Sequence, residues 1–144
     1  RSTNREEAAM SEDYNHEATE LELHISNHRP SYEDLVYTLC NLRKHHLRGN
    51  YDSERALKGL KYPVIRAAED YVKQYGTDHT VSGCEDDRWY RVFSVATRAV
   101  VCRSLLAMYE EEITAGDSWL DDEIQRRSWV VAGRPVIKMK EGAQ

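Results

Sequence analysis

Two histidines near the start of the chain have a spacing that could bind a metal ion. His24 and His28 are four residues apart, and a helix would place both imidazoles on one face, as in zinc-ligand pairs. However, Asn27 and Pro30 argue against a helix at this place, and no cysteine or glutamate completes a known ligand motif. We therefore expect these histidines to be structural and assign no metal ligand.

The other candidates for metal or acid–base chemistry are a second histidine pair and three acidic clusters. His45 and His46 are adjacent, so on a helix their side chains point about 100° apart and do not easily share one ion. The clusters at residues 85–87, 110–112 and 121–123 could hold a divalent ion, but consecutive acids on a helix fan outward. We expect solvated surfaces there. The alternative is that they imitate phosphate charge and dock on a basic protein.

Motifs that carry catalysis do not occur in the sequence. It has no Gly-rich phosphate loop, no nucleophile elbow and no HExxH zinc motif. We therefore assign no catalytic residue and no cofactor, and favour a protein that is not an enzyme. An enzyme whose site is assembled from distant residues stays an open alternative.

Six basic residues cluster around one predicted turn: Arg43, Lys44, Arg48, Arg55, Lys58 and Lys61. Tyr51 and Tyr62 lie nearby in the sequence, and aromatic rings beside basic side chains can stack on exposed nucleobases. The simpler interpretation is that these charges solvate the turn and complement helix dipoles. Because the chain has a net charge of -5, nonspecific binding of duplex DNA by its whole surface is disfavoured.

Three tryptophans in a chain without catalytic motifs favour a protein-binding function, because tryptophan is enriched where interfaces gain most of their energy. We predict that Trp119, Trp129 and Val131 form the contact surface. The leading hypothesis is a noncatalytic accessory module that binds a protein partner and could also self-associate. A nucleic-acid-binding accessory protein that uses the basic turn, residues 43–61, and a virion or assembly component are the alternatives.

Apolar periodicity predicts the elements that position these residues. Residues 21–25 alternate apolar and polar side chains, which is typical of a strand. A helix with one apolar stripe is predicted from Ser31, whose hydroxyl can cap the first turn, to about Leu47. Gly49 then supplies a left-handed stop.

Pro63 interrupts the most strongly patterned stretch of the chain. The apolar face continues almost in phase on both sides of it, yet a proline inside a helix removes one hydrogen bond and costs about 3 kcal/mol. We therefore predict two helices, residues 53–61 and 63–75, joined by a kink just before the proline. Asp52 or Ser53 would cap the first of them.

The second half of the chain predicts two more helices and a tail. Ser94 can cap a long helix that ends by Gly116, and a shorter helix follows from Asp117 or Ser118. Residues 128–140 contain two β-favouring runs around a glycine, which indicates a hairpin.

These elements predict a mainly-α fold: a small bundle of four to five helices with a kink at Pro63, and a small β element that joins the N-terminal strand to the C-terminal hairpin. The 144 residues suit one core, so we expect a flexible acidic arm at residues 1–18 and a single helical domain at residues 19–144, with the β-like tail at its end. Cys40 and Cys102 lie on apolar helix faces and are expected to be reduced core residues.

The sequence contains no run of roughly 20 apolar residues and no signal-peptide pattern, so we expect a cytoplasmic protein without a membrane span.

The stretch "YDSERALKGL…AAEDYVKQYG", followed by "W…VFSVATRAVVCRSLLAMYEEE", resembles small helical proteins of phage and prophage genomes, mostly of unassigned function. The resemblance covers about residues 50–113, and its matching positions are Tyr51, Asp52, Ala56, Leu57, Tyr71, Tyr75, Gly76, Trp89, Phe93, Ser94, Arg98, Tyr109 and Glu110. It implies no catalytic residues. It does imply an accessory role in which the protein binds a host or phage protein, in the host cytoplasm.

Overall fold

The computed structural model describes residues 16–75 and 93–131, with side chains up to residue 128 in the second range. Residues 16–27 form an N-terminal helix, and four labelled helices follow: α2 (Arg29–Leu47), α3 (Ser53–Tyr75), α5 (Val95–Thr114) and α6 (Trp119–Val131). The described residues contain no strand, so the prediction of a mainly-α bundle is confirmed.

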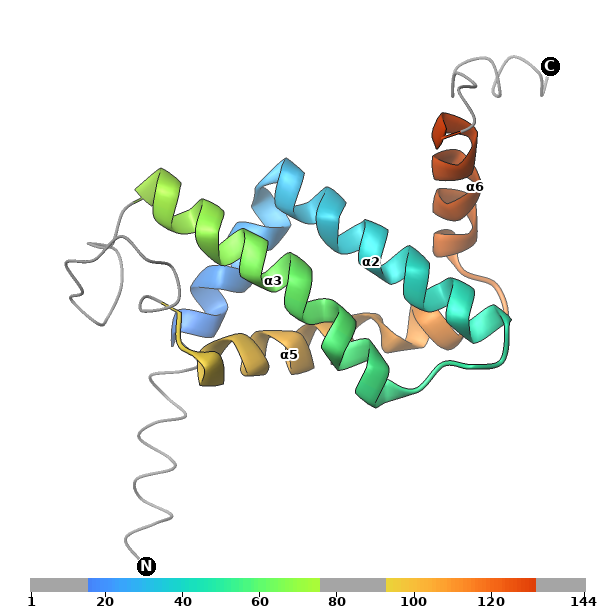
Figure 1. Ribbon diagram of the computed structural model, residues 1–144, viewed down its shortest axis with the longest axis horizontal. Helices are drawn as coiled ribbons and strands as arrows, with labels where there is room; N and C mark the ends of the chain where they lie inside the picture. The colour runs from blue at the N-terminus through green and yellow to red at the C-terminus, as the bar shows by residue number, and fades with distance from the viewer. Residues whose placement is uncertain (1–15, 76–92, 132–144) are drawn as a thin grey trace, which may run out of the picture.

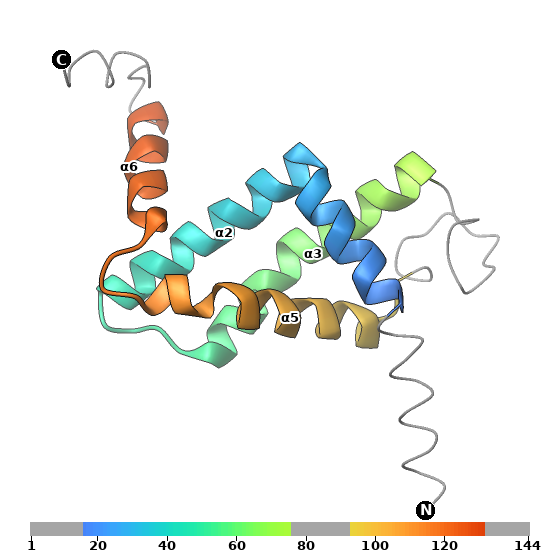
Figure 2. The same cartoon turned by 180° about the vertical axis from the view of Figure 1, so that it is seen from behind.

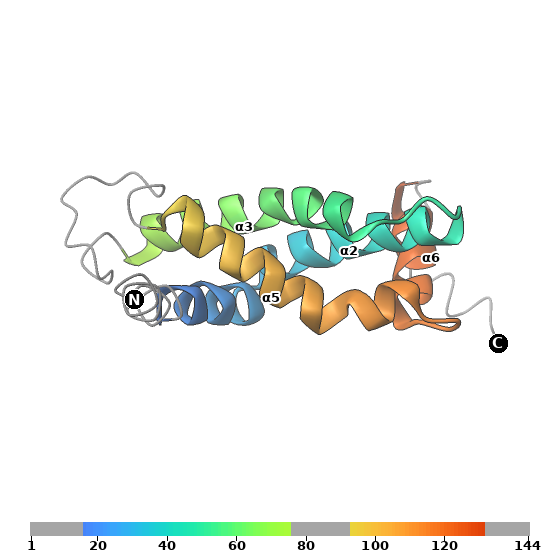
Figure 3. The same cartoon turned by 90° about the horizontal axis from the view of Figure 1, so that it is seen from below.

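The helices form one bundle in which α3 packs against both α2 and α5 (Figure 1). α5 crosses the lower side of the bundle, which Figure 3 shows from below. The N-terminal helix lies behind α3 in the view of Figure 1. Figure 2, seen from behind, shows that it leads directly into α2. α6 contacts α2 and α5 and stands at the far end of the bundle in both views (Figures 1 and 2).

A single hydrophobic core joins these helices. Its members include fully buried side chains from every helix, among them Leu21, Ile25, Leu35, Leu39, Leu60, Val64, Val101, Leu105, Ile113 and Leu120. The predicted positions of Cys40 and Cys102 in the core are confirmed, because both thiols are free and buried.

The predicted strand at residues 21–25 is wrong, since these residues belong to the N-terminal helix. Leu21 and Ile25 are four residues apart and both are buried, whereas Leu23 between them is 54% exposed. The apolar alternation is therefore part of a helical period of three and four residues, formed by residue types with high helix propensity.

Pro30 does not separate this helix from α2 by a long break. It lies in the first turn of α2, where proline lacks only an N–H group that would have no partner anyway. The predicted cap at Ser31 is wrong, because α2 begins two residues earlier with His28 as its N-cap. Gly49 does have the predicted left-handed conformation after α2, with φ of 79°.

The two helices predicted on either side of Pro63 are one helix, α3, which runs unbroken from Ser53 to Tyr75. The φ angle of proline suits a helix, so the local cost is one missing hydrogen bond and crowding at the carbonyl of Gly59, four residues earlier. The Pro63 ring is itself buried, and the apolar stripe stays in phase across it. Packing of the whole stripe therefore outweighs the local cost.

The predicted caps at Asp52 and Ser94 are confirmed. The Asp52 carboxylate accepts a hydrogen bond from the backbone N–H of Arg55 (2.9 Å), and the Ser94 hydroxyl accepts one from the backbone N–H of Thr97 (3.2 Å). The Ser118 hydroxyl likewise accepts a hydrogen bond from the backbone N–H of Leu120 at the start of α6.

The ends of the predicted domain differ from the structure where they can be compared. Residues 16–18 of the expected arm are helical, and Ala18 is buried in the core. Residues 128–131 of the expected β-like tail belong to α6, so the hairpin does not begin there. The rest of both segments lies outside the described residues. Among the helices that are described, none combines the length and apolar character of a bilayer span.

Candidate functional site

A groove of about 480 Å³ lies between α3 and α5, and we call it the α3–α5 groove. Its apolar lining consists of Leu57, Ile65, Val95, Ala99 and Cys102. Charged side chains also line it: Glu54, Lys58, Lys61, Arg98 and Arg103. Four basic groups against one acid make this apolar groove electropositive.

The helical period explains why apolar and basic groups meet there. Leu57, Lys61 and Ile65 are spaced by four residues along α3, so they lie on one face beside α5. That face borders the buried apolar stripe of α3 and is not part of it, so Leu57 and Ile65 are only partly buried. Val95, the first residue of α5, is 73% exposed, so an apolar side chain faces solvent at one end of the groove.

The basic groups of the groove differ in their surroundings. Burial lowers the pKa of Arg98, whose Nε donates a hydrogen bond to the backbone carbonyl of Ser94. Lys58, Lys61 and Arg103 are exposed, and no carboxylate in the described part of the chain forms an ion pair with them. These three charges are available to a partner. Burial raises the pKa of the Cys102 thiol at the groove to about 11, so it stays protonated at neutral pH.

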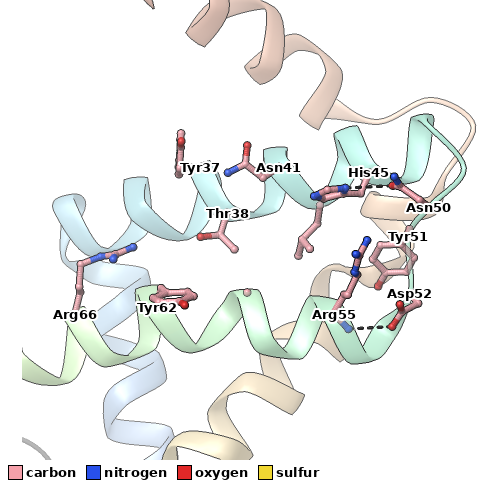
Figure 4. A pocket seen from close by; sticks show the side chains of 12 residues that line it. Tyr37, Thr38, Asn41, His45, Asn50, Tyr51, Asp52, Arg55, Tyr62 and Arg66 are labelled. Atoms are coloured by element: carbon pink, nitrogen blue, oxygen red, sulfur yellow. Dashed lines mark hydrogen bonds between the residues drawn. The ribbon is translucent and has the colours of Figure 1, made fainter.

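A second cavity, of about 410 Å³, lies between α2 and α3 (Figure 4). Figure 4 shows Thr38 on α2 pointing toward α3, and Tyr62 and Arg55 on α3 pointing toward α2. Gly59 lies at its floor, where a Cβ atom would meet only side-chain carbons of Leu42 and Thr38 at 3.9 Å each. Most of the residues that line this cavity are polar, and a carboxylate lies near each of its two arginines: Asp52 near Arg55, and Asp34, which pairs with Arg66.

The structure separates the predicted basic cluster. Lys44 and Arg48 are exposed at the end of α2, Arg55 lines the cavity between α2 and α3, and Lys58 and Lys61 line the α3–α5 groove. The six residues therefore do not form one surface, because they belong to different faces of two helices.

Arg43 differs from the other five basic residues of the predicted cluster, because its side chain is completely buried. Its guanidinium donates hydrogen bonds to both carboxylate oxygens of Asp121 (2.8 and 3.0 Å) and to the carbonyls of Ile113 (3.0 Å), Ala115 and Gly116 (3.2 Å). It thus fixes the turn between α5 and α6 onto α2. The expectation that Arg43 contributes to a nucleic-acid surface is wrong for this reason.

Two of the three acidic clusters, at residues 110–112 and 121–123, supply structural partners, while the cluster at residues 85–87 lies outside the described residues. The Glu110 carboxylate accepts hydrogen bonds from the hydroxyls of Tyr51 and Ser53, both at 2.7 Å, and these bonds lower the pKa of Glu110. Hydrogen bonding to Arg43 likewise lowers the pKa of Asp121.

Of the predicted protein-binding residues, Trp119 is described in full. It is 38% exposed at the start of α6 and lines a shallow acidic cleft with Glu112, Asp117, Asp121 and Asp122. Trp129 and Val131 belong to the last turn of α6, and their side chains lie outside the described residues.

His24 and His28, which we expected to be structural residues, lie together with Asp70 of α3. The distance from Asp70 Oδ2 is 2.9 Å to His24 Nε2 and 3.3 Å to His28 Nδ1, and the two rings stack with centroids 4.7 Å apart. His24 is buried, which lowers its pKa, while the hydrogen bond to Asp70 opposes that shift. Sequence spacing indicated the histidine pair, but nothing in the local sequence connects it to Asp70, 46 residues after His24.

No protein-family model, characterised protein or solved structure matches this chain. The resemblance of residues 50–113 to phage-encoded proteins therefore stays a prediction.

Proposed function

We propose that this chain is a noncatalytic protein-binding module, which takes an acidic amphipathic helix of a partner protein into the α3–α5 groove. The observation that carries the proposal is the combination, in one groove, of an apolar lining with four basic side chains and a single acidic one. If the resemblance to phage proteins holds, the partner is a host or phage protein.

The apolar lining supports a helix as the bound element. An amphipathic helix buries its apolar face in a groove through anchors spaced three and four residues apart. Leu57, Ile65 and Ala99 supply apolar surface between α3 and α5, and the exposed Val95 extends it at one end. Burial of this surface would provide the affinity.

The charges support an acidic partner. Lys58 and Lys61 flank the lining on the α3 side, and Arg98 and Arg103 flank it on the α5 side. Carboxylates on the two edges of a bound helix would meet these groups and set its register. Because Lys58, Lys61 and Arg103 are exposed, the electrostatic contribution should weaken as salt screens it.

The binding test uses a fluorescein-labelled peptide of about 18 residues, designed as an amphipathic helix with leucine on one face and glutamate on both flanks. Two control peptides have the same composition in scrambled order, or lysine in place of every glutamate. We expect the designed peptide alone to increase its fluorescence anisotropy when full-length protein is added, and to bind more weakly at high salt. No binding of the designed peptide, or equal binding of all three peptides, would overturn the proposal.

Two substitutions in the groove and one outside it locate the bound peptide. Val95→Asp places an acid in the groove at the first turn of α5, where a negative charge favours the helix, so the variant should fold and bind at least tenfold more weakly, a rough estimate. The double variant Lys58→Glu, Lys61→Glu should do the same. Lys44→Glu with Arg48→Glu makes the same charge change on α2 outside the groove and should leave binding nearly unchanged.

The remaining surfaces are tested in the same assay. A loss of binding in Trp119→Ala but not in Val95→Asp would move the site to α6. A labelled single-stranded oligonucleotide that binds at low salt, and is lost equally in both charge-reversal variants, would favour the nucleic-acid alternative. Light scattering of the free protein at the assay concentration would reveal a second copy as the occupant.

A further inference from the structure

We infer that His24, His28 and Asp70 form a binding site for one divalent transition-metal ion of the zinc type, independent of the α3–α5 groove. The three residues come from three elements: the N-terminal helix, the N-cap of α2, and α3. Together they are the only group of three ligand-type residues that converges in this way within the described ranges.

The donor set suits such an ion. Two imidazole nitrogens and a carboxylate oxygen are ligands that zinc, cobalt and nickel share, whereas calcium and magnesium prefer oxygen alone. The three ligand atoms lie within 4.8 Å of one another, so small movements of the side chains would bring all three onto one ion.

The distances agree with this assignment. Two ligand atoms that each lie 2.0–2.1 Å from a tetrahedral zinc ion are about 3.4 Å apart. The carboxylate oxygen Oδ2 of Asp70 lies 3.3 Å from His28 Nδ1 and 2.9 Å from His24 Nε2. The Asp70–His28 pair therefore already has the required spacing, the Asp70–His24 pair would open by a few tenths of an ångström, and the two histidine nitrogens would settle around the ion.

The surroundings hold the ligands in place. The His24 ring is packed edge-on against the rings of Tyr71 and Tyr75, and it stacks on His28 with an interplanar angle of 14°. The Ser31 hydroxyl lies 2.9 Å from His28 Nδ1, the nitrogen that would bind the ion, so the metal would replace this hydrogen bond. A metal site needs such supporting contacts, because the ligand side chains must keep one rotamer.

An open side remains for a fourth ligand. His24 and His28 line a cavity of about 400 Å³, whose wall also includes Glu20, Asn27 and Gln74. Because two of the three protein ligands face this cavity, the fourth tetrahedral position can open toward it and take water or a small anionic ligand.

Metal binding would fasten the N-terminal helix to α3, and this consequence provides a readout that does not depend on activity. The full chain, without a polyhistidine tag and freed of metal by a chelator, is titrated with Zn²⁺ by calorimetry and with Co²⁺ by visible absorption. We expect one ion per chain, tetrahedral Co²⁺ bands, and a melting temperature raised by about 5–10 °C at a hundredfold excess over the dissociation constant.

Two ligand variants and one matched control test whether the ion binds at His24, His28 and Asp70. Asp70→Asn keeps the shape of the side chain, and His28→Gln changes a ring that is only partly buried, so at least one of them should retain the fold. Each should weaken Zn²⁺ binding at least tenfold, a rough estimate, and abolish the cobalt bands. His45→Gln with His46→Gln removes the other histidine pair and should change neither.

Two results would overturn the inference. One is the absence of binding by the metal-free wild-type chain, which would leave the three side chains as a hydrogen-bonded cluster only. The other is binding that persists unchanged in both Asp70→Asn and His28→Gln, which would place the ion elsewhere on the chain.

Discussion

Replacement of Arg43 by methionine tests whether a buried cation holds the turn between α5 and α6. Methionine keeps much of the length of the side chain and removes the guanidinium. Five hydrogen bonds are lost, two to the carboxylate of Asp121 and three to the carbonyls of Ile113, Ala115 and Gly116. Those carbonyls have no other helical donor, because they lie at the end of α5 or beyond it.

The expected loss of stability in Arg43→Met depends on how deeply Arg43 and Asp121 are each buried. Removing one partner of a buried ion pair costs about 3–5 kcal/mol, because the other partner is left unpaired away from water. The side chain of Arg43 is 0% exposed but that of Asp121 is 40% exposed, so the carboxylate can regain water. We therefore expect the lower end of that range, about 3 kcal/mol, or a melting temperature reduced by roughly 6–12 °C.

A second arginine provides the control. Arg66 makes the same two-pronged pair with Asp34, also between two helices, but its side chain is 53% exposed and it binds no carbonyl. Arg66→Met should therefore cost less than about 1 kcal/mol. Arg43→Lys should recover little of the loss, because an ammonium group cannot reproduce the planar fork.

The assay is urea unfolding followed by circular dichroism, with all variants measured at pH 7 and one ionic strength. A chain of this length has about 7–20 kcal/mol of stability, so Arg43→Met should still fold and give a measurable midpoint. If Arg43→Met and Arg66→Met lose equal stability, burial and carbonyl bonding are not the source of the effect and the reasoning is refuted.

Three further predictions concern other parts of the molecule. Gly59→Ala should raise the free energy of unfolding by about 0.5–1 kcal/mol, since its Cβ would meet Leu42 and Thr38 at an ordinary 3.9 Å; a lower urea midpoint would contradict this. Hydrogen bonds lower the folded-state pKa of Asp121 and Glu110, so the stability they contribute is complete above the unfolded value near 4 and is lost as pH falls through the lower folded values. The urea midpoint of Asp121→Asn should therefore fall less steeply between pH 5 and 2 than that of wild type. Midpoints that fall in parallel for the two proteins would contradict this role of Asp121. Burial raises the pKa of Cys40 and raises that of Cys102 to about 11. Alkylation of either thiol at pH 8, followed by mass spectrometry of its peptide, should therefore be much slower in the folded chain than in the urea-unfolded chain. Equal rates would show that the thiols are accessible in the folded chain.

Periodicity and capping predicted the long helices because their signals are local. α5 begins after Ser94 and α3 begins after Asp52, as their cap chemistry indicated. At residues 21–25 the local pattern was too short to separate a period of two from a period of three and four. At Pro63 the local rule predicted a break that does not occur, because the buried stripe on both sides of the proline stabilises α3 over its whole length.

The candidate sites depend on contacts that no local pattern encodes. Arg43 looked like a surface charge near a helix end, and its partner Asp121 is 78 residues later. The pair His24 and His28 needed a helix and Asp70, and the sequence argued against the first and could not indicate the second. The α3–α5 groove was missed because Lys58 and Lys61 were grouped with their neighbours in sequence rather than with Arg98 and Arg103 across the groove.

The N-terminal helix, residues 16–27, has consequences for biosynthesis, because its partners are made long after it. The Glu17 carboxylate accepts a hydrogen bond from Thr97, 80 residues later, and the Glu20 carboxylate accepts one from Tyr71, 51 residues later. At 5–20 residues per second, a ribosome needs about 4–16 seconds to add 80 residues. The N-terminal helix must therefore wait for α5 before it can complete its native contacts, and its packing stays incomplete and open to chaperones during that interval.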